Sequence, residues 1–450
     1  MQGIEKYLSR TQNGHLALHG VDLASLTDEY GTPLFVFDEL SLENNFELFH
    51  KAFERVYPKT LVCYSIKTNS LPAISKILRK KGAFAEIASE LDLYVAKMAG
   101  FSGENLIFDG PYKSDKTLQM AIEEGIFLIN VESFTELKRV NKIAEKMGVK
   151  QAIGIRINPF TVPNFLKSLT PKNLFRAAHC YSECRFGFSI EEARLAFKQI
   201  AKMKNLCLEC LMVHPYHAAV KVLPSLSKEV YKNFNIEIKY LNIGGGFDPG
   251  VNTYASPLSL MWHFIKQKLG FGIALEGKKV TIDINAVAKF IADSIKQSME
   301  NLPEPTIISE PGRFLVTSSA LLLVHVDHVK TAGEYKWVFV DGGTNIVPSI
   351  YERHKIVIVN RAPGSTKEVV NIVGPLLYAD DFIGIKVLIP KISEDDILAV
   401  LNCGAYTISS STQFLYPRPN VLLVDFLKNV KVIRERETVE DVLRKDKVPI

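Results

Sequence analysis

The sequence predicts an α/β protein in which a (β/α)8 barrel is followed by a second domain made of strands. Between about residues 40 and 310, short apolar runs alternate with amphipathic, charged stretches at intervals of roughly 20 to 40 residues, which is typical of parallel βα units. Eight such units close a barrel of about 250 residues. After residue 313 the apolar runs are rich in β-forming residues, with Gly, Pro, Asn and Asp at the turns, which indicates an all-β domain.

Each expected barrel strand is one apolar run, and the charged stretch after it is expected to be a helix. The interval between the fifth and sixth runs, from residue 160 to residue 206, is long and irregular. The eight runs are "TLVCYSIKT", "FAEIAS", "ENLIFDG", "FLINVES", "QAIGIRINP", "LECLMVHPY", "EIKYLNIGGGF" and "PTIISEPGR".

The expected domains are residues 1–40, 41–312 and 313–450. The first contains two short strand-like runs, "HLALHG" and "PLFVFDE", and is expected to pack with the β domain. The second is the barrel. The third contains the runs "ALLLVHVDHVKTA", "YKWVFVDGG", "HKIVIVNRA", "KEVVNIVGP", "IKVLIPK", "ILAVLNCGAY" and "NVLLVDFLKNVKVIRE".

The composition is that of an ordinary globular protein, with 47% hydrophobic and 23% charged residues among 450. The net charge of +5 is spread along the chain without a long basic block, so nothing favours a nucleic-acid partner. The N-terminus lacks an apolar signal core, and no run of about 18 apolar residues occurs. We therefore expect a cytoplasmic protein that does not span a membrane.

Polar residues that are able to take part in catalysis or ligand binding stand where the expected strands end, which is where βα barrels place their active sites. Lys67 ends the first strand, and a neutral lysine amine forms a Schiff base with an aldehyde. The alternative is a lysine that simply reaches water. Bare glycine amides after the seventh strand are able to approach a phosphate closely, and Arg313 offers a cation to a phosphate or a carboxylate. The further strand-end residues are Glu86, Arg156, Asn158, His214, Gly244, Gly245, Gly246 and Glu310.

A zinc site is the competing interpretation of the run "CLECLMVHPYH". It contains Cys207, Cys210, His214 and His217, but no long loop separates the cysteines from the histidines. In a strand, Cys207 and Cys210 would point to opposite faces. We therefore expect no metal.

Several motifs, taken in order, resemble those of the fold-type III pyridoxal-phosphate decarboxylases, the group of diaminopimelate, ornithine and arginine decarboxylases. Alanine racemases share the barrel. The resemblance covers nearly the whole chain and is closest to diaminopimelate decarboxylases. Its motifs are "NGHLALHGVDLASLTDEYGTPLFVFDE", "YSIKTN", "RFGF", "LNIGGGF", "SEPGR", "VFVDGG", "GAYT" and "YPRPNVLLVDFLKNVKVIRERETVEDVL".

The resemblance implies that Lys67 carries pyridoxal 5'-phosphate as an aldimine, that Glu310 pairs with the ring nitrogen, and that His214 stacks on the ring. It implies catalytic roles for Lys67 and His214. Tyr378, in a segment that departs from the family, is a third catalytic candidate, because a phenol can act as the acid at Cα in place of the family's cysteine. The implied cofactor-binding residues are Lys67, Glu86, Arg156, His214, Gly244, Gly245, Gly246, Glu310, Gly312, Arg313 and Tyr406. The implied substrate-binding residues are Arg313, Asp341, Ser349, Tyr351, Leu377, Tyr378 and Asp381.

The chain departs from the family where a partner subunit completes the active site. That segment usually reads Gly-Pro-x-Cys followed by an acid, whereas this chain has "GPLLYADD", with Leu377 for the cysteine and Tyr378 for the acid. Ser349 stands near the position of an arginine that meets the distal carboxylate of diaminopimelate. A buried carboxylate without a cation is costly, so the pocket is poorly matched to that substrate.

The sequence therefore predicts a homodimeric decarboxylase of an amino acid other than meso-diaminopimelate. Three alternatives remain open: an authentic diaminopimelate decarboxylase that makes L-lysine, an amino-acid racemase, and a catalytically silent cofactor-binding homologue.

Overall fold

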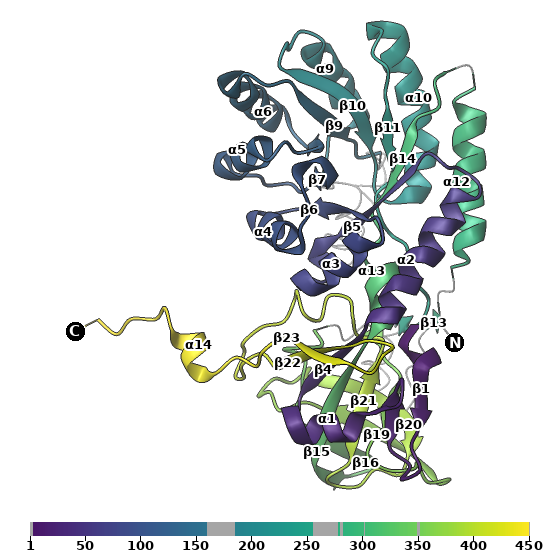
Figure 1. Ribbon diagram of the computed structural model, residues 1–450, viewed down its shortest axis with the longest axis vertical. Coiled ribbons are helices and arrows are strands. Elements are labelled where there is room, and N and C mark those ends of the chain that lie inside the picture. The colour runs from purple at the N-terminus through teal and green to yellow at the C-terminus, as the bar shows by residue number, and fades with distance from the viewer. Residues whose placement is uncertain are drawn as a thin grey trace.

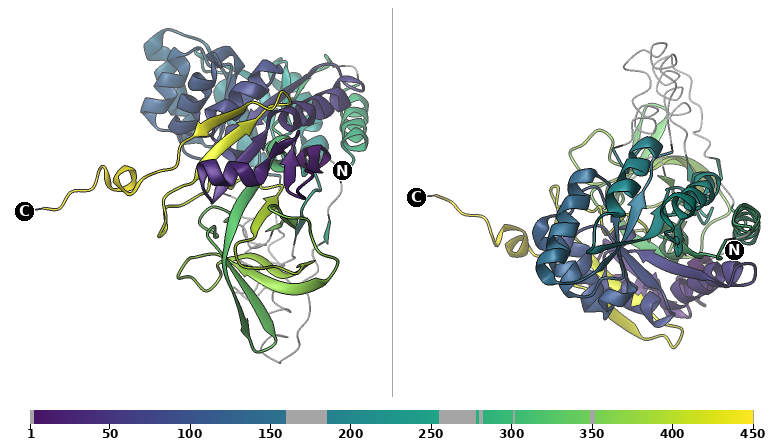
Figure 2. Two further views of the ribbon diagram at one scale, coloured as in Figure 1. Left: turned by 60° about the horizontal axis from the view of Figure 1, so that its bottom comes forward. Right: turned by 90° about the horizontal axis from the view of Figure 1, so that it is seen from above.

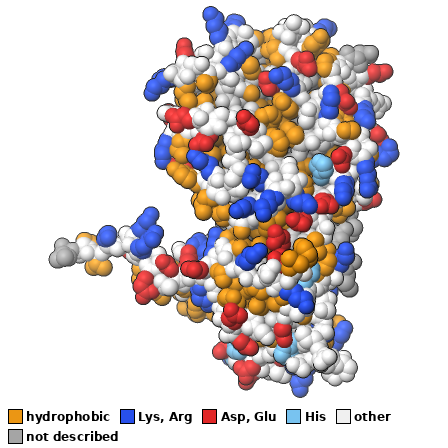
Figure 3. Space-filling model, in the orientation of Figure 1, with side chains coloured by type: hydrophobic (Ala, Val, Ile, Leu, Met, Phe, Trp, Pro, Cys, Tyr) orange, Lys and Arg blue, Asp and Glu red, His pale blue; other side chains and the backbone are white. Residues whose placement is uncertain are grey.

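The computed structural model describes residues 3–159, 185–254, 278–279, 282–300, 302–348 and 352–449. The chain forms two bodies, a barrel surrounded by helices and a mostly β domain beneath it, and its C-terminal segment projects away from both (Figure 1). Within the described ranges, no helix has both the length and the apolar character that a membrane span requires. Basic and acidic side chains are interspersed on the face turned to the viewer in Figure 3, without a block of one sign.

The eight predicted barrel strands are confirmed. All are parallel, and they close in the order β10-β11-β14-β5-β6-β7-β8-β9. Their bounds are β5 Thr60–Ser65, β6 Phe84–Ile87, β7 Leu106–Phe108, β8 Leu128–Val131, β9 Gln151–Arg156, β10 Leu206–Met212, β11 Tyr240–Asn242 and β14 Thr306–Ser309.

Helices cover the outside of the barrel, as the amphipathic stretches between the strands predict (Figures 1 and 2). Several begin at a serine whose side chain accepts a hydrogen bond from the backbone N–H three residues on, as Ser89, Ser133 and Ser189 do, and such caps fix where each helix starts. Their bounds are α2 Glu39–Glu54, α3 Pro72–Lys80, α4 Glu90–Ala99, α5 Asp115–Glu123, α6 Phe134–Met147, α9 Ile190–Ile200, α10 Tyr216–Phe234 and α12 Ile284–Ser298.

The second domain is built on one long strand, β15 (Ala320–Ala332). It pairs with β16 (Tyr335–Val340) along one part and with β4 (Leu34–Asp38) and β21 (Ile397–Leu401) along the other. The N-terminal segment thus adds a strand to this sheet. The other strands of the sheet are β18 Ile356–Ile358, β19 Lys367–Val373, β20 Phe382–Pro390, β22 Asn420–Val424 and β23 Val430–Arg434.

The two bodies are joined beside Lys67. The loop after β21 donates the backbone N–H of Tyr406 to the carbonyl of Thr68 at 2.8 Å. The side chain of Asn69 donates to the carbonyl of Gly404 at 2.9 Å. The β domain is therefore hydrogen-bonded to the end of the first barrel strand, and it forms part of the wall of any cavity at that end.

Candidate active site

A cavity of about 940 Å³ opens at the carboxyl end of the barrel strands. Ten of the predicted cofactor-binding residues line it, and Gly244 adjoins it through its contact with His214. The predicted residues in its wall are Lys67, Glu86, Arg156, His214, Gly245, Gly246, Glu310, Gly312, Arg313 and Tyr406.

Lys67 lies in a short 3-10 turn, Ile66–Thr68, directly after β5, and its amine faces the cavity. Its Nζ lies 2.7 and 2.5 Å from the two carboxylate oxygens of Glu86, and the hydroxyl of Ser65 donates to Glu86 at 2.5 Å. Burial favours the neutral amine, but the charges of Glu86 and Glu310 raise the pKa of Lys67 above its usual value. Burial likewise disfavours the Glu86 carboxylate, yet Lys67 holds the pKa of Glu86 below its usual value.

Glu310 follows β14, the strand that pairs with β5, and is almost fully buried. Its carboxylate accepts a hydrogen bond from the side chain of Asn242 at 2.6 Å. Burial, followed by the charges of Asp109 and Glu86, raises the pKa of Glu310 well above its usual value. The carboxyl group is thus placed where a cationic partner would stabilise its ionised form.

His214 stands two residues after β10, and the glycine run packs against it. The backbone N–H of Gly245 donates to His214 Nδ1 at 3.0 Å, so in the neutral ring the proton lies on Nε2. Burial lowers the pKa of His214, and the charges of Arg156 and Lys67 lower it further, to about 4. A Cβ on Gly244 would lie 2.7 Å from Nδ1, and Gly244 also has a φ of +64°, so no larger residue fits beside this imidazole.

Arg313 and Tyr406 close the side of the cavity that faces the β domain. The Arg313 guanidinium lies 4.8 Å from the centre of the Tyr406 ring and donates to Glu352 at 2.9 Å. Gly312, next to Arg313, leaves room for Thr68: a Cβ at Gly312 would lie 2.0 Å from the hydroxyl of Thr68. That hydroxyl is buried and has no hydrogen-bond partner in the described structure.

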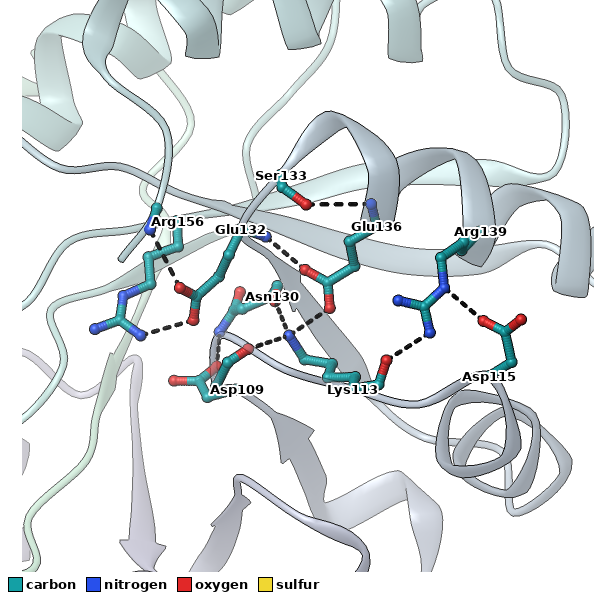
Figure 4. A network of polar contacts seen from close by, with 11 residues as sticks. Asp109, Lys113, Asp115, Asn130, Glu132, Ser133, Glu136, Arg139 and Arg156 are labelled. Carbon is teal, nitrogen blue, oxygen red and sulfur yellow. Dashed lines mark hydrogen bonds and ion pairs between the residues drawn. The ribbon is translucent and has the colours of Figure 1, made fainter. Parts of the chain in front are cut away.

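Arg156 ends β9 and lines the opposite wall. It donates to Glu132 at 2.8 Å (Figure 4). Its guanidinium also lies over the ring of Phe186, 4.7 Å from the ring centre. Burial disfavours its charge, but Glu132 and Asp109 raise the pKa of Arg156 above its usual value. The guanidinium therefore stays charged at the cavity wall.

Among the described residues, the predicted substrate-binding residues Asp341, Leu377, Tyr378 and Asp381 lie outside this cavity, whereas Arg313 lines it. Leu377 and Tyr378 lie in the loop between β19 and β20, where 94% and 56% of their surfaces are exposed. Asp341 accepts a hydrogen bond from the backbone N–H of His325 at 2.9 Å and, like Leu377, Tyr378 and Asp381, is absent from the cavity wall. The predicted residues Ser349 and Tyr351 lie outside the described residues.

Asp381 organises the loop that carries Tyr378. It accepts hydrogen bonds from the backbone N–H groups of Thr344 at 2.7 Å and Leu376 at 2.8 Å. A Cβ on Gly374 would lie 2.4 Å from the same carboxylate. Within one chain, Asp381 therefore fixes the conformation of the loop and does not reach the cavity.

Sequence reasoning missed Asp109, which lines the cavity, and two acids that pair with cavity residues, Glu132 and Glu352. Asp109 follows β7 and Glu132 follows β8, so both obey the strand-end rule that singled out Lys67. Glu352, the partner of Arg313, comes from the β domain, and no local pattern marks it. Among the described residues, no group of three or more His, Cys, Asp or Glu side chains is arranged to hold a metal ion.

Comparison with known proteins places these features in one family. The family model described as "Pyridoxal-dependent decarboxylase, pyridoxal binding domain" matches residues 41–317. A diaminopimelate decarboxylase of Aquifex aeolicus is 32% identical over 444 residues, which cover 96% of each chain. The crystal structure of a diaminopimelate decarboxylase from M. jannaschii in complex with L-lysine is 28% identical, with a TM-score of 0.80 and coverage of 100% of this chain and 99% of the other. An L-glutamyl-[BtrI acyl-carrier protein] decarboxylase of Niallia circulans is 26% identical over 453 residues, covering 95% of this chain and 96% of the other.

The cavity fits pyridoxal phosphate. It offers a lysine amine for an aldehyde, a buried carboxyl at Glu310 for a ring nitrogen, and glycine amides and an arginine for a phosphate. The cavity is lined by the β domain as well as by the barrel, because Tyr406 is part of its wall. The chain therefore belongs to the pyridoxal-dependent decarboxylases and is a pyridoxal-phosphate enzyme of the diaminopimelate decarboxylase type.

Proposed function

We propose that the protein decarboxylates an amino acid other than meso-diaminopimelate in the cavity around Lys67. The observation that carries this choice is the pairing of the cations in the wall. Lys67 is paired with Glu86, Arg156 with Glu132, and Arg313 with Glu352. A second substrate carboxylate that binds to one of these three cations would have to displace its acid, at a cost in free energy.

When bound, pyridoxal phosphate withdraws the electrons that remain on Cα when the substrate carboxylate leaves. The chain's own groups hold the protons around that centre. Glu86 lies within hydrogen-bond distance of Nζ, so it is the acceptor for the proton that Lys67 must lose before its amine reacts. His214 stays neutral at the cavity wall, and Glu310 presents its carboxyl group to the same cavity.

The proton that Cα receives after loss of the carboxylate is proposed to come from Tyr378. A phenol is a competent proton donor, whereas the neighbouring Leu377 has no such proton. Because Tyr378 lies outside the cavity of its own chain, we propose that the β19–β20 loop of a second subunit reaches this cavity, in a homodimer with two shared sites. The exposure of Leu377 supports this proposal, because an apolar side chain that is 94% exposed is stabilised when another surface covers it.

An authentic diaminopimelate decarboxylase is the second candidate. Relatives with that name support it, and so does Arg185, which lines the cavity and has no acidic partner among the described residues. Its guanidinium lies over the ring of Phe186 at 5.0 Å. In this candidate Arg185 binds the distal carboxylate.

The two candidates are separated by comparing kcat/KM for meso-diaminopimelate, ornithine, lysine, arginine and smaller amino acids of both hands, with chiral analysis of the product. The proposal expects meso-diaminopimelate to be at least about 30-fold poorer than the best substrate, the effect of one missing charge-assisted contact. If meso-diaminopimelate is the best substrate and Arg185→Met raises its KM alone, the second candidate is correct. Interconversion of enantiomers without CO₂ release would indicate a racemase.

A further inference from the structure

A buried polar network joins Lys113, Glu136 and Glu132 to the cavity residues Arg156 and Asp109 (Figure 4). At its centre is Lys113, whose side chain is fully buried. Its Nζ donates to the carbonyls of Gly110 at 2.7 Å and Asn130 at 2.9 Å, and to the carboxylate of Glu136 at 2.7 Å. All three protons of the ammonium group are thus satisfied, which is the condition under which a charged lysine is stable in a protein interior.

The network passes from Lys113 to Glu132 through the start of helix α6. Glu136 lies in the first turn of that helix, and its second carboxylate oxygen accepts the backbone N–H of Glu132 at 2.8 Å. Ser133, between them, caps the helix by accepting the N–H of Glu136 at 3.2 Å. The backbone N–H of Glu132 is therefore held by the first turn of the helix that follows it.

The side chain of Glu132 connects two parts of the cavity wall. One oxygen accepts from Arg156 at 2.8 Å, and the other accepts from the backbone N–H of Gly187 at 3.1 Å. Gly187 follows Phe186, whose ring centre lies 4.7 Å from the Arg156 guanidinium. A Cβ on Gly187 would lie 2.7 Å from the carbonyl of Arg156, so this turn packs directly on the end of β9. Glu132 thus bonds both to Arg156 and to the turn whose phenylalanine ring lies against Arg156.

The same network fixes a second cavity residue. Asn130, whose carbonyl accepts from Lys113, donates through its side chain to Asp109 at 2.5 Å. Gly110, the other carbonyl partner of Lys113, is the neighbour of Asp109 in the chain. The ends of β7, β8 and β9 are therefore tied together by one lysine and two glutamates that do not themselves line the cavity.

We propose that Glu132 is a positioning residue of the active site, which holds Arg156 in the wall of the pyridoxal phosphate cavity, and that Lys113 and Glu136 hold Glu132. The proposal rests on pyridoxal phosphate binding in this cavity but not on the choice of substrate. Its physical basis is that a free arginine side chain has many rotamers, whereas one held by a carboxylate and a ring is fixed before the ligand arrives.

Glu132→Gln tests the proposal, because glutamine keeps the length of the side chain but removes its charge and one acceptor. Of Arg156 and Gly187, one then faces an N–H donor instead of an oxygen. We expect the variant to bind pyridoxal phosphate about 10- to 100-fold more weakly than the wild type, and the visible absorption band of the bound cofactor to shift. Asp115→Asn is the matched control. It removes the exposed ion pair with Arg139 at the outer end of the same network, and it should bind pyridoxal phosphate as the wild type does.

A double-mutant cycle with Arg156→Met separates positioning from a general loss of stability. If Glu132 acts through Arg156, the double variant binds pyridoxal phosphate no more weakly than Arg156→Met alone. The paired variant Lys113→Met/Glu136→Gln, which removes both buried charges together, should weaken binding less than Glu132→Gln because it is one step further from Arg156. If Glu132→Gln does not fold, the cycle is run with Glu132→Asp and the same expectation.

The proposal is overturned if Glu132→Gln keeps the affinity and the spectrum of the wild type. It is also overturned if the double variant loses affinity for pyridoxal phosphate by the full product of the two single-variant fold losses. Failure of the wild type and of Asp115→Asn to bind the cofactor would instead contradict the function assigned to the cavity.

Discussion

The cavity around Lys67 and the loop between β19 and β20 were both expected to belong to one active site, but within one chain only the cavity is assembled. The cavity residues come from the ends of the barrel strands and contact one another at hydrogen-bond distances, as Lys67 and Glu86 do. The loop presents Leu377 and Tyr378 to solvent. A parallel barrel brings its strand ends together within one chain, whereas a loop of the β domain needs a second surface before its side chains are covered.

The loop is nevertheless well defined. Asp381 ties it to Thr344 and Leu376, so the exposed side chains are presented in a fixed conformation. On the proposed function, the site has a part that binds the cofactor within the chain and a part that acts on substrate from a second chain. Variants in the two parts should fail in different ways.

The largest effect is expected for Lys67→Ala. Loss of the only proposed attachment point for the cofactor should lower decarboxylation by about 1,000-fold or more. In the wild type, borohydride reduction followed by mass spectrometry should find the cofactor on Lys67. Lys116→Ala, which removes an exposed lysine paired with Glu90, is the control and should keep both adduct and activity. An adduct on another lysine would contradict the assignment.

Glu310→Gln should have the next largest effect. The variant removes the carboxyl group proposed to face the ring nitrogen while it keeps the size of the side chain. Turnover should fall by about 100-fold or more, because the cofactor becomes a weaker electron acceptor. The absorption spectrum should change as well. An unchanged spectrum with unchanged turnover would remove Glu310 from the cofactor site.

Tyr378→Phe should lower turnover by about 10- to 100-fold, the range of a lost proton donor. Unlike the cavity variants, it should leave the absorption spectrum and the affinity for pyridoxal phosphate unchanged. Leu377→Ala serves as its neighbour control and should have a smaller effect on turnover. If Tyr378→Phe weakens cofactor binding as strongly as a cavity variant does, the division between the two parts is wrong.

The smallest effect concerns pH and His214. Its pKa in the folded protein, about 4, lies below the usual value of 6.5, so between these values the unfolded chain binds a proton that the folded chain does not. This residue therefore makes the protein less stable as pH falls from 6.5 towards 4. Melting temperatures should fall less steeply over this window in His214→Gln than in the wild type. Parallel curves would show that His214 titrates normally.

Much of the barrel and its site followed from the sequence because each strand is an apolar run that ends in a polar residue. Lys67, His214 and Glu310 were found by that rule, and Asp109 and Glu132 would have been found had it been applied to the third and fourth strands. Glu352 could not be found in this way, since its role depends on how the β domain packs against Arg313. The structural role of Asp381 was also hidden, because its partners are backbone groups of segments brought together by the fold.

Subunit complementation tests most directly whether two chains build one site. Lys67→Ala lacks a functional cavity but has an intact loop, and Tyr378→Ala has the reverse. If the two inactive proteins are mixed under conditions of proven subunit exchange, half of the dimers should be mixed, and each of these should contain one intact site, which restores roughly a quarter of wild-type activity. No recovery of activity despite exchange would contradict the account and would place Tyr378 outside the active site.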